Sequence, residues 1–196
     1  MQLIGITGAK GSGKSSVANI LTNSRGFVRL RYADALKRML RTMGLTYEHI
    51  DGDLKNEPCD LLGGKTPRWA MQSLGTEWGR KLITNDLWVN IVRQEIIDTC
   101  KQKPEVKIVI DDVRHPNEVA SIAELGGSLW RVRRPDVEPR VTPLGLWFAR
   151  RGWHPRIHSS EAYWRDFVAN AVIPNDGNLH ELKAQVLRVL PRIPVL

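Results

Sequence analysis

Eight residues near the N-terminus, Gly8 to Ser15, restrict the fold of this chain more than any other segment. They read GAKGSGKS and match the pattern G-x-x-x-x-G-K-[ST]. Glycines at these positions let the backbone wrap around phosphate groups so that several N–H groups point inward. The apolar run Leu3–Thr7 precedes the loop, and residues 14–22 carry apolar side chains at helical spacing. The sequence therefore predicts a strand, a phosphate-binding loop and a helix, with the positive helix N-terminus at the phosphates.

Two polar side chains at the end of this loop have predicted chemical roles. Lys14 is long enough to reach the β- and γ-phosphates of a nucleotide, and the Ser15 hydroxyl can bind Mg²⁺. The loop alone does not identify a substrate, because the same pattern serves kinases, GTPases, motors and nucleic-acid ATPases. The sequence has no GTPase-type N-K-x-D box, which disfavours a GTPase.

Predicted strands and helices alternate along the chain. The strands are expected at 3–7, 28–32, 106–110, 129–132 and 171–173. The helices are expected at 14–22, 35–43, 67–78, 87–96, 117–125, 144–150 and 179–190, and Asp34 is expected to cap the second of them. Residues 44–66 are predicted to form a loop or short helices. This alternation is typical of an α/β fold with three layers, in which helices cover both faces of a parallel sheet.

The length of 196 residues suits one domain with room for a modest lobe or insertion. We expect a single domain, 1–196, whose core consists of 1–32, 104–133 and 166–196. Two segments interrupt the simple alternation, the stretch 44–103 with its extra helices and the arginine-rich stretch 134–165. Both are predicted to be insertions at the ligand-binding end of the sheet.

A second acidic position follows the predicted strand that ends at Ile110. Asp111 and Asp112 come directly after it, in the arrangement that places a carboxylate beside a Mg²⁺–phosphate assembly. Adjacent acids repel each other unless a cation offsets them, and the sequence leaves open which of the two arranges the metal. The alternative interpretation is a strand-end turn in which an Asp caps the next helix. Arg114 is expected to point toward a phosphate.

The positive charge of the chain is concentrated in two segments. The chain carries 29 Lys and Arg against 21 Asp and Glu, a formal net charge of +8. Residues 1–30 contribute +4 and residues 131–165 contribute +5, and every cation of the second segment is an arginine. A guanidinium group holds phosphate oxygens with a rigid fork. This placement favours small phosphorylated ligands, and no stable nucleic-acid binding is expected.

The composition indicates an ordinary globular protein, with 42% hydrophobic and 26% charged residues. No apolar run approaches the roughly 20 residues of a membrane span, and no membrane partner is expected. The first residues, MQLIGITG, lack the basic region of a secretory signal. Cys59 and Cys100 do not make a disulfide framework. We therefore expect a cytoplasmic protein, in the host cytoplasm if a phage encodes it.

Several further motifs, taken with the phosphate loop, make the chain similar to a known family. They are ADALK at 33–37, MQSLGTE at 71–77, DVR at 112–114, RVRRP at 131–135, HSSE at 158–161 and IPNDGNL at 173–179. With these the chain resembles the phage-type deoxynucleoside monophosphate kinases, a branch of the P-loop nucleotide kinases. The connectors 44–66 and 136–157 carry little of the resemblance.

The resemblance implies a five-stranded parallel core, a monophosphate-binding helical lobe at about 33–103 and a lid at about 134–165. It implies that the γ-phosphoryl group of ATP passes to a deoxynucleoside 5′-monophosphate, with ATP and Mg²⁺ as cofactors. The implied ATP-binding residues are Gly8, Lys10, Gly11, Ser12, Gly13, Lys14, Ser15, Ser16, Asn175 and Gly177.

The same resemblance implies the remaining functional residues. The implied substrate-binding residues are Asp34, Lys37, Arg68, Gln72, Thr76, Arg114 and Glu161. The implied catalytic residues are Lys14, Asp112, Arg114 and Arg134, the implied lid residues are Arg150, Arg151 and Arg156, and the implied metal residues are Ser15 and Asp111. The sequence does not indicate which bases are accepted, and it leaves a homodimer open.

Two alternative functions are compatible with the motifs. The first is another small-acceptor P-loop kinase, acting on a ribonucleotide or on dephospho-coenzyme A. The second is a nucleic-acid-binding ATPase, which the net charge permits but which the placement of that charge disfavours. An acceptor screen across deoxy- and ribonucleoside monophosphates separates these alternatives.

Overall fold

The computed structural model describes residues 1–138, 141–151, 153 and 162–190. Contacts between Cα atoms divide the chain into two compact units. The core unit consists of Met1–Arg31 and Glu95–Leu196, and the helical unit consists of Tyr32–Gln94. Among the described residues, no helix is long and apolar enough to cross a membrane.

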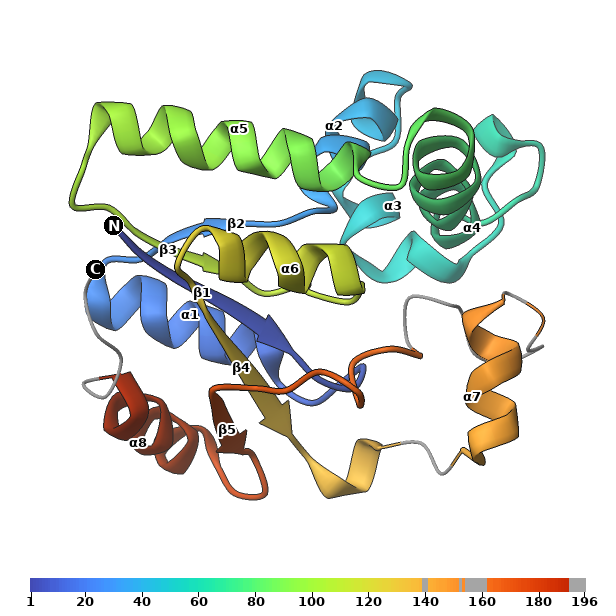
Figure 1. Ribbon diagram of the computed structural model, residues 1–196. Coiled ribbons are helices and arrows are strands. Elements are labelled where there is room, and N and C mark those ends of the chain that lie inside the picture. Colours follow the sequence, from blue (N-terminus) through green and yellow to red (C-terminus); the bar gives the residue numbers. More distant parts are fainter. Residues whose placement is uncertain (139–140, 152, 154–161, 191–196) are drawn as a thin grey trace. The chain divides into compact units, whose positions relative to one another are not determined.

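A five-stranded sheet with all strands parallel forms the centre of the core unit (Figure 1). Its strands are β1 (Gln2–Thr7), β2 (Val28–Leu30), β3 (Lys107–Ile110), β4 (Ser128–Arg133) and β5 (Ala171–Pro174). They follow the order β2-β3-β1-β4-β5, so β1 pairs with β3 on one side and with β4 on the other. Because the strands are parallel, the loops after β1, β3, β4 and β5 all leave from one edge of the sheet. This confirms the predicted sheet.

Helices cover both faces of this sheet. On one face lie α1 (Lys14–Arg25) and α8 (Leu179–Val189), which pack on the buried side chains of Ile4, Trp130 and Val132. The other face carries α6 (Pro116–Glu124), which contacts β1 and β4. The approach there is close, because a Cβ atom on Gly5 would lie 2.3 Å from Ile122 Cδ1. Full burial of each large apolar side chain contributes roughly 1.5–3 kcal/mol, so these contacts fix the loops at the sheet edge. The three-layer α/β fold is confirmed.

After β4 the chain forms two short elements before the sheet resumes. These are a 3₁₀-helix, η4 (Pro135–Val137), and the helix α7 (Pro143–Arg150). Thr142 caps α7 by accepting a hydrogen bond from the Gly145 N–H over 3.1 Å. The residues implied as a lid thus include one described helix in which Arg150 is the last residue.

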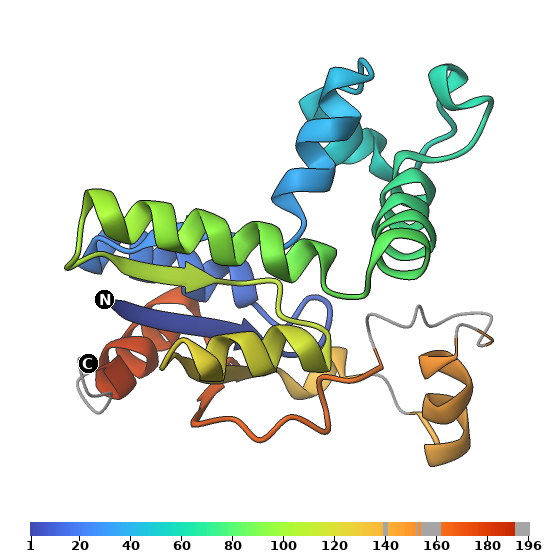
Figure 2. The ribbon, with the colours of Figure 1, turned by 45° about the horizontal axis from the view of Figure 1, so that its top comes forward.

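The helical unit consists of short helices joined by tight turns. Its elements are α2 (Asp34–Thr42), α3 (Tyr47–Ile50), the 3₁₀-helices η1 (Asp53–Asn56) and η2 (Asp60–Leu62), α4 (Pro67–Gln72), the π-helix η3 (Ser73–Ile83) and the first half of α5 (Leu87–Gln102). Figure 2 shows α4 running on into the π-helix. The predicted helix at 67–78 is therefore present and extends further than expected.

Trp88 explains the unusual winding of η3. The Trp88 indole is buried, and its Nε1 donates a 2.8 Å hydrogen bond to the Gly75 carbonyl oxygen. A Cβ atom on Gly79 would lie 2.5 Å from the indole ring, so only glycine fits there. A carbonyl oxygen that accepts a hydrogen bond from an inserted side chain interrupts the regular α-helical pattern of backbone hydrogen bonds. A π-helical stretch accommodates this interruption.

The predicted cap of the second helix is wrong by one residue. Asp34 is the first residue of α2, and the capping position belongs to Ala33, which makes no side-chain hydrogen bond. The backbone of Ala33 already has φ −80° and ψ −9°, close to helical values, so the chain enters the helix without an extended capping residue. The acid in the first turn still interacts favourably with the helix dipole.

Candidate active site

The phosphate loop lies between β1 and α1 at the edge of the sheet from which the loops leave. Gly8, Gly11 and Gly13 have φ values of +139°, +80° and +101°, a region that residues with a side chain rarely adopt. A Cβ atom on Gly8 would lie 2.4 Å from the Val132 carbonyl oxygen on β4. The glycines are therefore required both by the turn and by the close approach of the loop to β4.

Two polar side chains of the loop, Lys14 and Ser12, differ in their hydrogen bonding. Lys14 Nζ donates hydrogen bonds to the carbonyl oxygens of Gly8 and Ala9, at 2.8 and 2.7 Å. The Ser12 hydroxyl is fully buried and has no hydrogen-bond partner within the described part of the chain. A buried polar group without a partner is uncommon and is often completed by a ligand.

Asn175 connects the loop after β5 to the phosphate loop. Its side-chain Nδ2 donates a 2.8 Å hydrogen bond to the Ser12 carbonyl oxygen, and its backbone N–H donates a 2.8 Å hydrogen bond to the Arg133 carbonyl oxygen. A Cβ atom on Gly13 would lie 2.3 Å from Asn175 Nδ2. Asn175, an implied ATP-binding residue, therefore lies against the phosphate loop itself. The other implied residue of this segment, Gly177, is exposed.

The carboxylate of Asp111 lies at the end of β3 and is almost fully buried. Ser15 Oγ donates a 3.0 Å hydrogen bond to Asp111 Oδ2. From β2 and the residue after it, Arg29 Nε and Arg31 Nε donate to Asp111 Oδ1 over 2.9 and 3.1 Å, and Arg29 Nη2 donates to Oδ2. The predicted metal residues Ser15 and Asp111 are thus brought together.

The ionisation of Asp111 is decided by these neighbours. Burial alone would raise the pKa of the Asp111 carboxyl group, because the charged form loses hydration. The hydrogen bonds and charge of Arg29, the charge of Arg31 and the Ser15 hydroxyl outweigh burial and hold the pKa below its ordinary value of 3.8. Asp111 is therefore an anion at every physiological pH.

Arg29 and Arg31 were not among the residues inferred from the sequence. Two arginines at alternate positions of a short predicted strand are unusual, because such a strand is mostly covered by helices. That pattern was the available signal for a buried acid nearby. The register of β2 with β3 pairs Leu30 with Ile110, which brings both arginines beside the acid that follows β3.

The segment after Asp111 is held by a buried glutamate. Glu118 Oε2 accepts hydrogen bonds from the backbone N–H groups of Arg114 and His115, at 2.6 and 2.9 Å. Thr7 Oγ1 donates a 3.0 Å hydrogen bond to the Val113 carbonyl oxygen. These contacts fix the backbone of 112–115, which carries the implied catalytic residues Asp112 and Arg114.

Most of the implied acceptor residues belong to the helical unit. Lys37 on α2 forms an ion pair with Asp51 at 2.5 Å, and Arg68 Nε on α4 donates to Asn56 Oδ1 over 2.6 Å. Gln72 ends α4, and Thr76 lies four residues later, so the two share one side of the continuous helix. Contacts between α2 and α4 bring these elements together within the unit.

The implied lid arginines make local contacts around α7. Arg150 forms an ion pair with Asp166, and its guanidinium group lies 5.6 Å from the centre of the Tyr163 ring. The Arg151 guanidinium stacks over the Trp147 ring at 3.6 Å. Arg134 is exposed and precedes η4. Arg156 and Glu161 lie outside the described residues.

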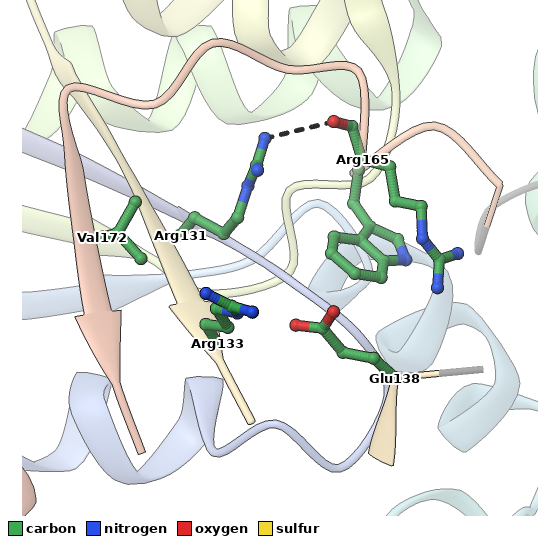
Figure 3. Close-up of a pocket in the computed structure, with 6 residues that line it drawn as sticks. Arg131, Arg133, Glu138, Arg165 and Val172 are labelled. Carbon is green, nitrogen blue, oxygen red and sulfur yellow. Dashed lines mark hydrogen bonds between the residues drawn. The ribbon is translucent and has the colours of Figure 1, made fainter. Parts of the chain in front are cut away.

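A pocket of about 360 Å³ lies on the side of β4 opposite to α1 (Figure 3). It is lined by Arg131, Arg133, Glu138, Trp164, Arg165 and Val172. Arg131 Nη2 donates to the carbonyl oxygens of Arg165, at 3.3 Å, and of Phe167. The Arg165 guanidinium lies 4.5 Å from the centre of the Trp164 ring. The hydrogen bonds of Arg131 attach the chain that precedes β5 to β4, which is a structural use of this arginine.

The comparisons with known proteins agree with this geometry. A family model described as deoxynucleotide monophosphate kinase matches residues 64–151. A protein of Acanthamoeba polyphaga mimivirus, named a deoxynucleotide monophosphate kinase, is 31% identical over 198 aligned residues, which cover 95% of each chain. The deoxynucleoside-5′-monophosphate kinase of Escherichia phage T5 is 45% identical over 121 residues, covering 62% of this chain and 44% of the phage protein.

One solved structure supports the fold independently. The crystal structure of TT1252 from Thermus thermophilus superposes with a TM-score of 0.51 at 20% identity, covering 99% of this chain and 98% of the other. The sheet order, the phosphate loop and the acid after β3 define a P-loop fold, and the family model and the two relatives identify a nucleotide kinase. Its similarity to the mimivirus protein extends over nearly the whole length. The chain belongs to the deoxynucleotide monophosphate kinase family.

Proposed function

We propose that this chain transfers the γ-phosphoryl group of ATP to a deoxynucleoside 5′-monophosphate and so forms the diphosphate and ADP. The observation that carries the proposal is the pairing of a glycine-rich phosphate loop with the Ser15–Asp111 contact at the sheet edge, in a member of this family. Phosphoryl transfer needs alignment and charge neutralisation more than covalent chemistry, and this arrangement supplies both.

The phosphate loop and Lys14 hold the donor nucleotide in this proposal. Backbone N–H groups of Gly11 to Ser15 and the N-terminus of α1 favour an anion bound at the loop. Lys14 donates to the carbonyl oxygens of Gly8 and Ala9 within the loop, and we assign its charge to the β- and γ-phosphates of the donor. Asn175 holds the loop through its hydrogen bond to the Ser12 carbonyl oxygen.

The residues present fit a magnesium ion bound together with ATP. Because Ser15 donates its single hydroxyl proton to Asp111, both lone pairs of the Ser15 oxygen stay available to a cation. A hydroxyl oxygen is a ligand of the kind that Mg²⁺ accepts, and Asp111 orients that hydroxyl by accepting its hydrogen bond. When bound, the ion neutralises charge on the β- and γ-phosphates.

The acceptor is assigned to the helical unit and to Arg114. Lys37, Arg68 and Arg114 supply positive charge for the phosphate of the monophosphate, while Asp34, Gln72 and Thr76 offer polar contacts to sugar or base. Lys37 and Arg68 make contacts with Asp51 and Asn56, so acceptor binding replaces or extends those contacts. Glu161 keeps its implied place in this set.

The lid assignment concerns the arginines of 134–165. Arg134 is assigned to the transferring phosphoryl group, and Arg150, Arg151 and Arg156 to closure over the nucleotides. In the described structure Arg150 pairs with Asp166, a contact that must open before the Arg150 side chain reaches a phosphate. Closure excludes water and thereby prevents hydrolysis of ATP.

The experiment is an acceptor screen with ADP formation as the readout. Purified chain receives ATP, Mg²⁺ and each deoxy- and ribonucleoside monophosphate, with dephospho-coenzyme A and duplex DNA as further arms. Rapid ADP formation that requires a deoxynucleoside monophosphate supports the proposal. Turnover with dephospho-coenzyme A alone, or ATP hydrolysis stimulated by DNA without an acceptor, contradicts it.

Lys14→Ala is the matched loss-of-function variant for this screen. Its turnover is expected to fall to background, since the charge assigned to the β- and γ-phosphates is lost together with the hydrogen bonds of Lys14 to the Gly8 and Ala9 carbonyl oxygens. Its circular dichroism spectrum and unfolding midpoint are expected to stay close to those of the wild type, because the Lys14 side chain is half-exposed. Wild-type turnover in this variant would overturn the assignment of the donor site.

A further inference from the structure

The Asp111 carboxylate accepts four hydrogen bonds from three side chains. Arg29 Nε and Arg31 Nε donate to Oδ1, while Arg29 Nη2 and Ser15 Oγ donate to Oδ2. Arg29 is itself held from α1, because Arg29 Nη1 donates a 2.9 Å hydrogen bond to Asn19 Oδ1. The guanidinium group of Arg29 therefore binds both carboxylate oxygens of Asp111 and fixes the orientation of the carboxylate.

These four hydrogen bonds use the full acceptor capacity of the carboxylate. An ionised carboxyl group has two oxygens with about four lone-pair sites in total. Two guanidinium groups also place two positive charges against the single negative charge of Asp111. A cation approaching Asp111 would meet no vacant lone pair and a net positive environment.

Ser15 is the group in this cluster that remains able to bind a cation. Its proton points to Asp111 Oδ2, and the Ser15 side chain is exposed while Asp111 is only 4% exposed. Donation of the proton fixes the direction of the Ser15 oxygen lone pairs. In this cluster the Ser15 hydroxyl is therefore oriented and open to a cation, while the Asp111 carboxylate has all its acceptor positions filled.

We propose that Arg29 and Arg31 are positioning residues that saturate Asp111, so that Asp111 orients Ser15 without binding the metal itself. A consequence is that the metal is held only when nucleotide phosphates are present, because the chain alone offers it one neutral hydroxyl oxygen at this cluster. The proposal rests on the proposed function for the identity of the bound nucleotide, but its test does not need an acceptor.

The test measures Mn²⁺ binding by electron paramagnetic resonance, without nucleotide and with ATP. Wild-type chain is expected to bind Mn²⁺ weakly without nucleotide and tightly with ATP. Arg29→Gln removes one positive charge and frees two lone pairs of Asp111. Its affinity for Mn²⁺ without nucleotide is expected to rise by about tenfold, the usual scale for removal of one close opposite charge from a carboxylate.

A double variant assigns the new binding to Asp111. Arg29→Gln combined with Asp111→Asn removes the negative charge together with the arginine, and its Mn²⁺ affinity without nucleotide is expected to return to the wild-type value. Arg29→Lys keeps the charge but not the fork, so it is expected to bind Mn²⁺ as weakly as the wild type. Arg188→Gln makes the same charge change at an exposed position of α8 and is expected to have no effect.

Activity gives a second readout that a merely structural role would not produce. In Arg29→Gln the kcat is expected to fall about tenfold and the Mg²⁺ concentration for half-maximal rate to change, with the acceptor KM unaltered. If Arg29→Gln does not fold, Arg31→Gln carries the test, because it leaves the Arg29 fork in place. Its Mn²⁺ affinity is expected to rise about threefold, since one donor and one charge are lost.

The decisive comparison is between the arginine variants and the wild type without nucleotide. If Arg29→Gln and Arg31→Gln both bind Mn²⁺ as the wild type does, the proposal is overturned. It is equally overturned if the wild type binds Mn²⁺ tightly without nucleotide and Asp111→Asn abolishes that binding, since Asp111 would then be a ligand. A chain that fails the acceptor screen but shows these Mn²⁺ shifts would contradict the proposed function alone.

Discussion

The side chain of Asn175 donates a 2.8 Å hydrogen bond to the backbone carbonyl oxygen of Ser12, in the middle of the phosphate loop. The backbone N–H of the same residue donates to the Arg133 carbonyl oxygen, at the end of β4. One residue after β5 therefore joins two other loops at the sheet edge. A phosphate loop that holds its shape before nucleotide arrives loses less entropy when it binds.

Asn175→Ala is expected to weaken ATP binding more than acceptor binding. Loss of one partly buried hydrogen bond costs about 1 kcal/mol, which corresponds to roughly a fivefold rise in the KM for ATP if the loop loosens by that amount. Steady-state kinetics with each substrate varied in turn measures the effect. Equal increases in both KM values would contradict a specific role at the donor site.

Asn170→Ala is the matched control for this prediction. The Asn170 side chain also bridges two segments of the core unit, because its Oδ1 accepts a 2.7 Å hydrogen bond from the Leu129 N–H. This contact lies at the start of β4, away from the phosphate loop. We expect Asn170→Ala to lower the free energy of unfolding by about 1 kcal/mol while the KM for ATP stays unchanged.

Gly13→Ala is expected to impair the donor site severely. Gly13 has a φ of +101°, and a Cβ atom there would lie 2.3 Å from Asn175 Nδ2. The variant therefore combines backbone strain with displacement of Asn175, and ATP affinity is expected to fall at least tenfold, measured by calorimetry.

Gly26→Ala provides the contrast, since its φ is +70° but no atom lies within 4 Å of its Cβ position. It is expected to cost about 1 kcal/mol of stability without changing ATP affinity. Unchanged ATP affinity in Gly13→Ala would contradict this prediction.

Local patterns in the sequence were sufficient to predict most of the fold. The buried strand before Gly8 and the apolar spacing after Lys14 are both short-range signals, and the structure has β1 and α1 where these signals placed them. The strand ending at Ile110 and the turn at Gly126 and Gly127 are signals of the same kind. Helix ends were less predictable, as Asp34 shows, because the φ and ψ of the preceding residue depend on how the chain enters the helix.

The partners within the site could be predicted only in part. Asp111 was identified because it follows a strand, but its contact with Arg29 joins residues 82 positions apart. Such a pair becomes visible only when the strand order and the register of β2 on β3 are known. The same holds for Asn175 and Ser12, which are 163 positions apart. Long-range pairing of polar side chains leaves no periodic trace in the sequence.

The stability of the chain is expected to fall in acid partly through Asp111. Its pKa is held below the ordinary value of 3.8 by Arg29, Arg31 and Ser15 in the folded state, against the opposing effect of burial. The resulting stabilisation is therefore fully present above the unfolded pKa near 3.8 and is lost as the pH falls through the lower folded value. Urea unfolding at pH 7, 5, 4 and 3 measures this dependence.

Arg29→Gln combined with Asp111→Asn serves as the control for the acid titration. The double variant has neither the buried carboxylate nor its principal partner, so its stability is expected to fall less steeply below about pH 4 than that of the wild type. Parallel curves for the two proteins across the whole range would show that Asp111 contributes nothing to the acid dependence.

Gly79→Ala is expected to destabilise the helical unit through Trp88. A Cβ atom at Gly79 would lie 2.5 Å from the buried indole ring, so the ring must move and its hydrogen bond to the Gly75 carbonyl must weaken. Overpacking of this kind costs about 1–3 kcal/mol. Gly75→Ala is the matched variant in the same π-helix, where the nearest atom, Leu36 Cδ2, lies at an ordinary 3.4 Å. Its stability is expected to stay within about 1 kcal/mol of the wild type.

Steady-state kinetics tests whether the packing of Gly79 against Trp88 supports acceptor binding in the helical unit. Because Gln72 and Thr76 lie on the helix that Trp88 braces, Gly79→Ala is expected to raise the KM for the deoxynucleoside monophosphate several-fold while the KM for ATP stays near the wild-type value. Gly75→Ala is expected to leave both unchanged. A rise in the KM for ATP alone would place the acceptor outside the helical unit, and equal stability of the two variants would contradict the packing argument.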